Sequence, residues 1–270
     1  MDQIFIYGVY HFFAFELCQQ FLNEGYQVTG IPYPFQEDDE ELAMMVGRNA
    51  NFIEWKGTNQ TLDQTIDKKE QKSFLFFSHY DHQFLEDQHY DEIIEHIQLN
   101  LDLSKIDQTI IFQPAEYTCT SIQLDRFTAF QKKVSAIVSN PVYIALPPLY
   151  GMRQPEKDLF VHVYRNKEVA EVPKSNFDYI LSSETAAAFV VKKLFPSFES
   201  TFLKSNGGFT GFIDYILQKE YKWSGKLSVW SRDDLETMKE VEVPGTESVK
   251  EKHKEWIQRI DSQHKNTFHV

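Results

Sequence analysis

The amino-acid sequence predicts an α/β fold, in which a doubly wound parallel sheet carries helices on both faces and a smaller α/β lobe follows it. Short apolar runs alternate with amphipathic stretches over the first 150 residues, and the links between them are short. This alternation is typical of strand–helix–strand units, whose strands lie parallel in one sheet. The run over 74–77 is entirely apolar, as expected of a parallel strand covered on both faces. The 270 residues suffice for one large domain or for a domain with a small cap.

Six strands and three helices are expected before residue 155. The first strand ends at Gly8, and a helix follows because Phe13, Leu17 and Phe21 recur every four residues. Prolines stop several of the strands, as Pro114 does after residue 112. The expected strands are 3–8, 27–31, 51–55, 73–78, 109–112 and 142–146, and the expected helices are 11–23, 90–104 and 123–138.

The pattern changes after about residue 155. We therefore predict one domain over 1–155 and a smaller C-terminal lobe over 156–270, with interleaved packing between the two. Residues 232–262 are rich in charge and are expected to end in a surface helix. In the C-terminal lobe the expected helices are 183–194, 209–220 and 248–262, and the expected strands are 160–164, 177–181, 200–203 and 226–230.

Charge and cysteine content exclude several classes of function. Acidic residues outnumber basic ones 40 to 27, which gives a net charge of −13. Binding to nucleic acid or to an anionic membrane needs clustered Lys and Arg, so we expect neither partner.

Cys18 and Cys119 form no disulfide framework and no metal-binding spacing, so we expect a cytoplasmic protein. The apolar start over 4–18 lacks a basic region and a cleavage site, and no long apolar run exists; we expect neither signal peptide nor membrane span.

Four segments in a matching order carry a resemblance to a known family. Residues 1–33 contain a strand, a loop that begins at Gly8, a helix, Asn-Glu-Gly-Tyr-Gln-Val and a second strand. Residues 142–151 read Val-Tyr-Ile-Ala-Leu-Pro-Pro-Leu-Tyr-Gly, and 177–189 and 203–208 add two more segments. The chain thereby resembles the extended short-chain dehydrogenase/reductases, the NAD-dependent epimerase/dehydratase group. The resemblance spans nearly the whole chain and implies a Rossmann-type doubly wound parallel sheet that binds NAD or NADP.

The chain departs from the family pattern at positions that bind the cofactor or catalyse the reaction in family members. Family members use three glycines to bring the backbone close to the cofactor pyrophosphate; here only Gly8 is present, and His11 stands at the second position. Pro32 replaces the acidic residue that holds the ribose hydroxyls. Ala115 replaces the catalytic Ser or Thr, and residues 122–134 contain no tyrosine for the expected Tyr-x-x-x-Lys pair. Since that tyrosine is the acid/base group, we expect the fold to be kept and the standard reaction to be lost.

The resemblance also implies which residues line the cofactor cleft. Two interpretations stay open: residues 10–13 fill a vacated cleft, or a shifted dinucleotide or another nucleotide still binds there, with His11 beside a phosphate. The residues expected at the cleft are Gly8, Tyr10, His11, Phe12, Phe13, Pro32, Tyr33, Ser78, Ala115 and Pro147.

A histidine-rich segment follows the strand over 73–78. His79-Tyr80-Asp81-His82 lies at the carboxyl edge, where open α/β sheets bind ligands. A metal or acid/base cluster is one interpretation. The spacing matches no metal motif, however, so we expect a solvated loop and helix face and no metal site. No catalytic residue is assigned; the candidates for displaced catalytic groups are Tyr117, His79 and Lys132.

Three functions follow as hypotheses. The first is a sensor or scaffold, a pseudoenzyme that binds a dinucleotide weakly or not at all. The second is an active NAD(P)-dependent epimerase, dehydratase or reductase acting on a nucleotide sugar or a similar small substrate. The third is a protein-interaction module. The expected partners are accordingly a small nucleotide ligand, a partner protein, or a second copy of the chain, since family members often dimerise through helices corresponding to 90–104 and 123–138.

Overall fold

The structure is a computed structural model that describes residues 2–35, 40–55, 72–86, 88–119, 121–138, 140–155, 180–205, 228–231 and 238–243. Within these residues eight strands form one sheet in the order β12-β10-β7-β5-β4-β1-β2-β3, and every neighbouring pair is parallel. The strand order reverses between β1 and β4, which is the topology of a doubly wound sheet. The predicted Rossmann-type α/β fold is therefore confirmed.

The sheet and its helices have the following bounds. The sheet consists of β1 (Gln3–Tyr7), β2 (Gln27–Ile31), β3 (Phe52–Glu54), β4 (Ser73–Ser78), β5 (Gln108–Pro114), β7 (Pro141–Leu146), β10 (Thr201–Ser205) and β12 (Lys239–Val243). Two small sheets pair β6 (Glu116–Cys119) with β11 (Ser228–Ser231), and β8 (Leu149–Tyr150) with β9 (Leu181–Ser182). The helices are α1 (Phe12–Asn23), α2 (Glu40–Gly47), α3 (His79–His82), α4 (Gln88–Asn100), α5 (Ser121–Ile137) and α7 (Ser183–Phe189), with the turns η2 (Leu103–Lys105) and η3 (Val190–Leu194).

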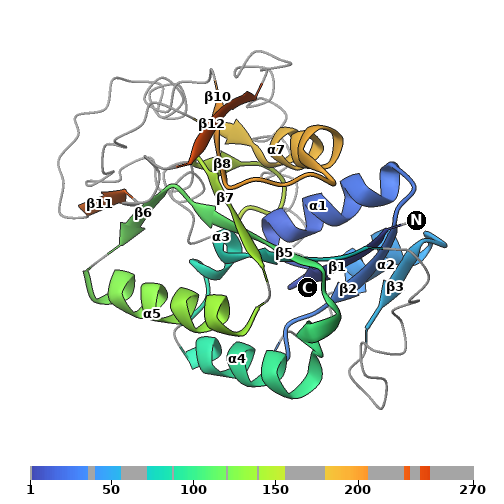
Figure 1. Ribbon diagram of the computed structural model, residues 1–270, viewed down its shortest axis with the longest axis horizontal. Helices are drawn as coiled ribbons and strands as arrows, with labels where there is room; N and C mark the ends of the chain where they lie inside the picture. The colour runs from blue at the N-terminus through green and yellow to red at the C-terminus, as the bar shows by residue number, and fades with distance from the viewer. Residues whose placement is uncertain are drawn as a thin grey trace, which may run out of the picture.

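Two apolar cores lie on the two faces of the sheet. Helices α1 and α7 pack side by side on one face, and α4 and α5 cover the other (Figure 1). Because side chains alternate along a strand, Phe74 and Phe76 join the core beneath α1, whereas Leu75 and Phe77 join the core beneath α4 and α5. This double coverage explains why β4 has no polar position in its centre.

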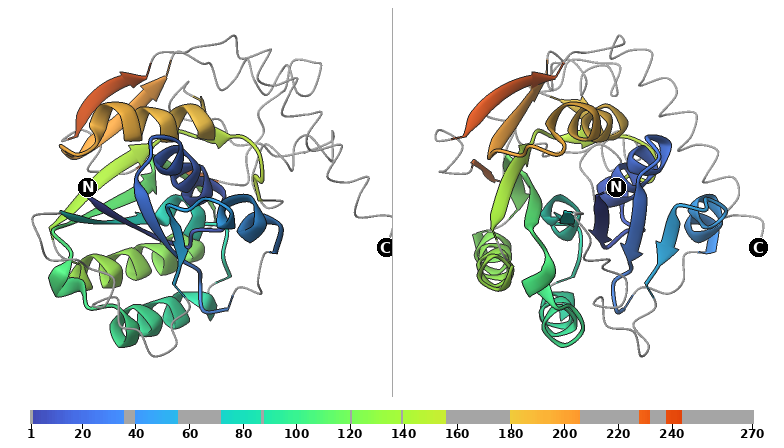
Figure 2. Two further views of the ribbon diagram at one scale, coloured as in Figure 1. Left: turned by 90° about the vertical axis from the view of Figure 1, so that its right-hand side faces the viewer. Right: turned by 45° about the vertical axis from the view of Figure 1, so that its right-hand side comes forward.

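Strands from the C-terminal part of the chain extend the same sheet. Strand β10 pairs with β7, and β12 pairs with β10, so both lie at the end of the main sheet (Figures 1 and 2). The β8–β9 pair also joins residues from before and after position 155. The division into domains at residue 155, with interleaved packing between the two parts, stays a prediction.

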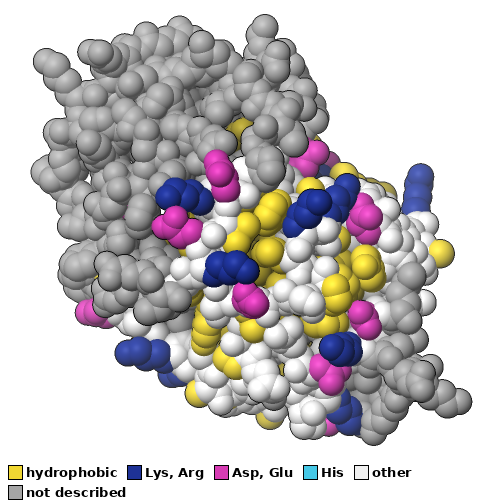
Figure 3. Space-filling model, turned by 45° about the horizontal axis from the view of Figure 1, so that its top comes forward, with side chains coloured by type: hydrophobic (Ala, Val, Ile, Leu, Met, Phe, Trp, Pro, Cys, Tyr) yellow, Lys and Arg dark blue, Asp and Glu magenta, His cyan; other side chains and the backbone are white. Residues whose placement is uncertain are grey.

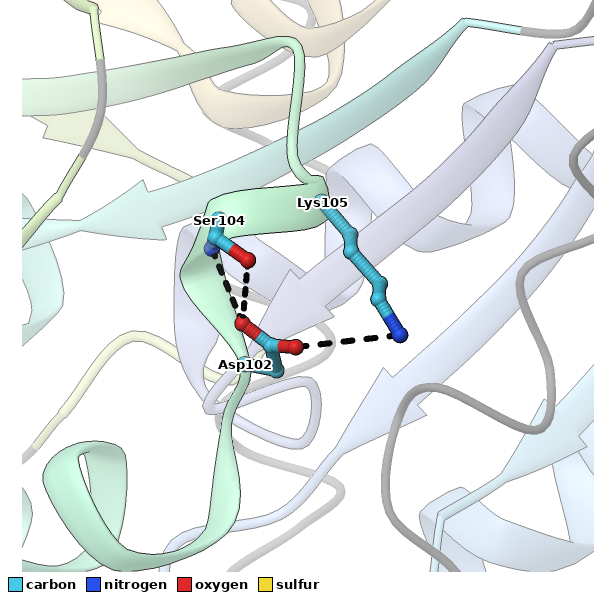
Figure 4. Close-up of polar contacts among 3 residues, drawn as sticks. All are labelled: Asp102, Ser104 and Lys105. Carbon is cyan, nitrogen blue, oxygen red and sulfur yellow. Dashed lines mark hydrogen bonds and ion pairs between the residues drawn. The ribbon is translucent and has the colours of Figure 1, made fainter.

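The turn between α4 and β5 shows why one helix is shorter than expected. Asp102 accepts hydrogen bonds from the backbone N–H of Ser104 at 3.2 Å and from its hydroxyl at 2.6 Å, and it forms an ion pair with Lys105 at 3.7 Å (Figure 4). An aspartate at this position caps a new turn. The helix expected over 90–104 therefore ends at Asn100, and η2 leads into β5.

Several short elements were not predicted. These are α2, α3, β6, β8 and β12. Strand β12 was missed because its charges suggested a surface segment, although Val241 and Val243 alternate with Glu240 and Glu242 as in a strand with one buried face. The strand expected over 177–181 is described only from residue 180, and the elements expected over 160–164, 209–220 and 248–262 lie outside the described residues.

The described surface carries mixed charge. On the face shown in Figure 3, basic and acidic side chains are interspersed among apolar ones, and neither sign forms a continuous patch there. Ion pairs such as Lys204–Glu240 and Lys239–Glu199, at 3.0 and 3.1 Å, link neighbouring elements. None of the helices among the described residues is both long enough and apolar enough to cross a membrane.

Candidate functional site

The turn from β1 into α1 brings a helix N-terminus to the carboxyl edge of the sheet. Gly8 has a φ of +69°, which favours glycine. Its N–H donates to the carbonyl of Ile31 at 2.7 Å, and the N–H of His11 donates to the carbonyl of Gly8 at 2.9 Å. The N–H groups of the first helical turn have no acceptor within the helix and attract negative charge. The edge of the sheet at β1 and β4 is thus the natural place for an anion.

The ring of Tyr33 fills the space above this turn. A β-carbon at Gly8 would overlap the Tyr33 ring, which is only 2% exposed. The Tyr33 ring centroid lies 4.4 Å from that of His11 and 5.3 Å from that of His82. Burial raises the pKa of the Tyr33 hydroxyl, and the neighbouring Asp81 and Tyr7 raise it further. Tyr33 is therefore a neutral packing group at neutral pH and a poor proton donor.

Asp81 caps helix α1 from a distant part of the chain. The N–H of Phe13 donates to one Asp81 carboxylate oxygen and the N–H of Ala14 to the other, each at 3.0 Å. The residue that precedes the helix, His11, makes no capping bond with its own side chain. Burial raises the pKa of Asp81 to about 6, against the lowering effect of the bonds from Phe13, Ala14 and Ser78. A carboxylate of the protein itself thus occupies the anion position at α1.

The histidines of α3 are buried, so the expected solvated face is wrong. His79 and His82 are 1% and 0% exposed, and their ring centroids lie 5.3 Å apart. Both rings pack against Phe130 of α5, with centroid distances of 5.5 and 5.1 Å. Helix α3 is held inward at two points: Asp81 binds α1, and the Tyr80 hydroxyl accepts the N–H of Leu149 at 2.7 Å.

Burial also favours the neutral form of the His11 and His82 imidazoles. It lowers the pKa of His11 to about 4. It lowers the pKa of His82 well below its ordinary value, and the nearby His79 and His11 lower it further. Among the described residues, neither ring nitrogen of His82 has a hydrogen-bond partner, nor does the His11 Nε2 or the Tyr33 hydroxyl. In the same part of the chain no group of three or more His, Cys, Asp or Glu side chains could hold a metal ion.

The structure brings part of the expected cleft together. Gly8, His11 and Tyr33 come together at this edge, where Tyr33 also contacts His82, and Ser78 accepts the N–H of Asp81 at 3.3 Å. The other expected cleft residues lie in the neighbouring elements. The Tyr10 hydroxyl donates to Glu54, and Phe12 and Phe13 of α1 are buried in the core on that face of the sheet. Pro32 is half-buried after β2, and Ala115 and Pro147 are buried after β5 and β7.

The three candidates for displaced catalytic groups lie in different surroundings. His79 is buried in the cluster just described. Lys132 is exposed on α5. Tyr117 pairs through its backbone with Trp230 in the small β6–β11 sheet, and its side chain lies outside what the structure describes. No described contact joins these three residues.

Sequence reasoning missed Asp81 as a site residue. Its place after β4 at the carboxyl edge was visible, but its partners Phe13 and Ala14 lie 68 and 67 residues away in the chain. A contact of that separation has no local sequence signal, because it depends on how β1 and β4 pair.

Comparison with known proteins decides the fold. No family model and no curated protein matches the sequence. Among solved structures, a dTDP-glucose 4,6-dehydratase of Bacillus anthracis in complex with NAD matches 97% of each chain, with a TM-score of 0.61 and 9% identity. A UDP-N-acetylglucosamine 4-epimerase of Methanobrevibacter ruminantium, in complex with UDP-N-acetylmuramic acid, matches 97% of this chain and 99% of its own, with a TM-score of 0.54 and 14% identity. A UDP-glucuronic acid 4-epimerase of Bacillus cereus in complex with NAD matches 90% of this chain and 89% of its own, with a TM-score of 0.52 and 12% identity.

This chain has the Rossmann-type fold of these two epimerases and this dehydratase. The fold that the resemblance implied is thereby confirmed. The similarity lies in the arrangement of elements, since the identity to these three proteins is only 9 to 14%.

The dinucleotide cofactor that a Rossmann-type fold implies does not fit the described cleft. In Rossmann-type folds a dinucleotide places its pyrophosphate on the N-terminus of the first helix, close to the glycine turn. Here the carboxylate of Asp81 holds the N–H groups of Phe13 and Ala14, and the Tyr33 ring lies over Gly8. A pyrophosphate at the same place would meet a negative charge and a buried ring.

Proposed function

We propose that this chain is a sensor or scaffold protein that keeps the extended short-chain dehydrogenase/reductase fold but closes its dinucleotide cleft with its own side chains. The observation that carries the proposal is the position of Tyr33 over Gly8, at the turn that dinucleotide-binding relatives of this fold leave open. The capping of α1 by Asp81 supports it. The protein then acts by binding a partner or a different ligand, and it transfers no hydride.

The chemistry of the described groups supports the same conclusion. Hydride transfer to or from a carbonyl needs a proton donor or acceptor whose pKa lies near the working pH. Burial moves the pKa of Tyr33 upward, away from that range, and moves that of His11 down to about 4. Ala115, at the position of the family's Ser or Thr, has no hydroxyl to polarise a substrate oxygen. The edge of the sheet offers a packed cluster in place of a catalytic set.

A titration tests this function directly. The purified chain is titrated at pH 7.5 with NAD, NADP, their reduced forms and UDP-sugars, with calorimetry and the melting temperature as readouts. A ligand that binds only the folded state stabilises it by about 2.7 kcal/mol at a hundredfold excess over its Kd. We expect no shift at millimolar concentration. A clear shift with any dinucleotide overturns the closed cleft.

The solved structures of the same fold support a second candidate function, that of an active enzyme. Those neighbours include an epimerase and a dehydratase in complex with NAD and an epimerase in complex with a UDP-sugar. An active NAD(P)-dependent enzyme on a nucleotide sugar would need displaced catalytic groups, for which Tyr117, His79 and Lys132 are the candidates. It predicts cofactor-dependent turnover that Tyr117→Phe or His79→Ala abolishes, and the absence of dinucleotide binding excludes it.

A further inference from the structure

Five residues form one polar cluster at the N-terminus of α1, called here the Asp81 cluster: Tyr33, His79, Asp81 and His82, which are buried, and His11, which is half-buried with its Nε2 atom buried. They come from the residue that precedes α1, the segment after β2 and the short helix α3. Successive ring centroids lie 4.4 Å (His11–Tyr33), 5.3 Å (Tyr33–His82) and 5.3 Å (His82–His79) apart. Buried polar atoms normally have partners, yet His82, His11 and Tyr33 each keep one or more polar atoms without one among the described residues.

The geometry at Asp81 is that of a bound anion. Its two carboxylate oxygens each accept one N–H from consecutive residues of α1, at 3.0 Å. A helix N-terminus carries about half a positive charge, which a carboxylate or a phosphate group satisfies equally well. Asp81 is therefore an internal ligand that occupies the position an external anion would need.

We propose that the Asp81 cluster is an acid-operated latch: on acidification His11 and His82 take up protons, Asp81 releases the N-terminus of α1, and that N-terminus becomes free for a phosphate-bearing anion. The proposal rests on the closed cleft described above as the proposed function. It adds a condition under which the cleft opens and names the chemical class that enters.

The surroundings of the Asp81 cluster determine the direction of the effect. Asp81 itself interacts with the N–H groups of α1, with Ser78 and with Tyr33 after β2. The other titratable groups around the Asp81 cluster are Tyr7 of β1, which contacts Tyr33, and His11, His79 and His82, which interact with one another. From α4 the Tyr90 hydroxyl donates to the carbonyl of His82, and α5 contributes the apolar rings of Phe127 and Phe130.

Protonation of the imidazoles opposes the closed arrangement. Cationic His11 and His82 would lie in a buried site beside the positive end of a helix, where a charged imidazole is strongly disfavoured. Opening returns both rings to water, and their charge then attracts an anion to the freed N–H groups. The titration of Asp81 has the opposite effect. Because its pKa is raised in the closed cluster, Asp81 takes up a proton there more readily than in the open form, and acid therefore favours the closed form through this residue.

The balance still favours opening in acid. Each histidine that regains a pKa of about 6.5 on opening contributes roughly tenfold to the equilibrium between pH 7.5 and 5.5, and the raised pKa of Asp81 offsets about fourfold. With two such histidines, lowering the pH from 7.5 to 5.5 shifts the equilibrium between the closed and open forms toward the open form by at least about tenfold. This fold-change is the quantity to measure.

The experiment measures the binding of inorganic diphosphate to the full chain by calorimetry at pH 5.5 and 7.5 and at equal ionic strength. We expect the wild type to bind at least tenfold more tightly at pH 5.5. His82→Phe keeps an aromatic ring but takes up no proton, so it should reduce the effect of acid, whereas Asp91→Asn, at a side chain of α4 that is 85% exposed, should preserve it. Near-UV circular dichroism at both pH values reports that the protein remains folded.

Asp81 variants test the internal ligand without a change of pH. Asp81→Ala, and Asp81→Asn if the alanine variant does not fold, should bind diphosphate at pH 7.5, whereas the exposed Asp91→Asn should behave like the wild type. Equal binding by the wild type at both pH values, or no binding by folded protein at pH 5.5, overturns the latch. Dinucleotide binding by the wild type at pH 7.5 would instead overturn the closed cleft itself, so the two failures are distinguishable.

Discussion

The ring of Tyr33 lies over the position that a β-carbon of Gly8 would occupy. The two residues belong to neighbouring parallel strands, since Tyr7 is paired with Ile31 in the β1–β2 register and the chain leaves both strands at the same edge. A glycine is needed at position 8 for two reasons: its φ of +69° and the closeness of this ring. In this chain the first glycine of the family pattern therefore makes room for a side chain.

Gly8→Ala should be more damaging than a glycine replacement elsewhere. Positive φ alone costs about 1 kcal/mol for alanine, and at Gly25, with φ +82° and no atom within 4 Å of a β-carbon, this is the whole expected cost. At Gly8 the overlap with Tyr33 adds to it, and we expect a loss of about 2–4 kcal/mol in total. Urea unfolding of Gly8→Ala, Gly25→Ala and the double variant Gly8→Ala/Tyr33→Ala measures this, and the double variant should recover part of the loss. Equal losses at both glycines would contradict the contact.

The stability of the protein should fall as the pH is lowered from 7.5 to 5. Burial lowers the folded-state pKa of His11 to about 4 and that of His82 well below its ordinary value. Below about pH 6.5 the unfolded chain binds more protons at these histidines, so unfolding becomes easier in acid. Asp81 has the opposite sign, because its folded-state pKa is raised from 3.8 to about 6 and its contribution to stability is lost as the pH rises through that window.

Asp81→Asn should therefore steepen the dependence of stability on pH. The variant removes the one carboxylate of the Asp81 cluster, whose titration offsets the histidines. Urea unfolding at pH 5, 6 and 7.5 is the measurement. Asp91→Asn, whose side chain is 85% exposed, should leave the profile unchanged, and a wild-type profile that is flat over this range would argue against neutral buried histidines.

Phe112→Ala should be among the costliest core substitutions. The side chain is fully buried in β5, with its ring centroid 5.1 Å from that of Phe13 and 6.2 Å from that of Phe76. Removal of a buried phenylalanine ring costs about 3–5 kcal/mol. Leu99→Ala, at a position that is 74% exposed on α4, should change stability by less than about 0.5 kcal/mol. Chemical denaturation of the two variants compares them, and similar values would contradict the packing of β5 against α1.

Two substitutions in β12 test whether the C-terminal part completes the sheet. Val243 is 1% exposed, whereas Glu240 lies on the surface and pairs with Lys204. Val243→Ala should cost about 1.5–3 kcal/mol because it removes two buried carbon groups and leaves a cavity. Glu240→Ala should cost less than about 1 kcal/mol, as expected of an exposed ion pair. Thermal unfolding measures both, and no effect of Val243→Ala would place β12 outside the core.

The sequence by itself determined the fold class and most of the sheet. The apolar run of β4, the four-residue spacing in α1 and the glycine turn are local patterns, and each has a physical meaning that needs no partner elsewhere in the chain. The missing tyrosine and the residues at 11, 32 and 115 were equally visible, because a departure from a motif is read at one position. Strand β12 also has a local signal, the alternation of valine with glutamate. It was not predicted because its charged residues suggested a surface segment.

Only the tertiary structure decided what fills the cleft. Residues 79–82 look polar and were expected in solvent, yet His79, Asp81 and His82 are buried because α3 lies between α1 and α5. The contact of Asp81 with α1 joins residues 67 and 68 positions apart, and that of Tyr33 with Gly8 joins two different strand ends. Such contacts depend on which strands are neighbours and at what register, and the free energy of burying a polar group depends on everything packed around it. Neither the pairing of the strands nor the free energy of burying these side chains can be read from a short stretch of sequence.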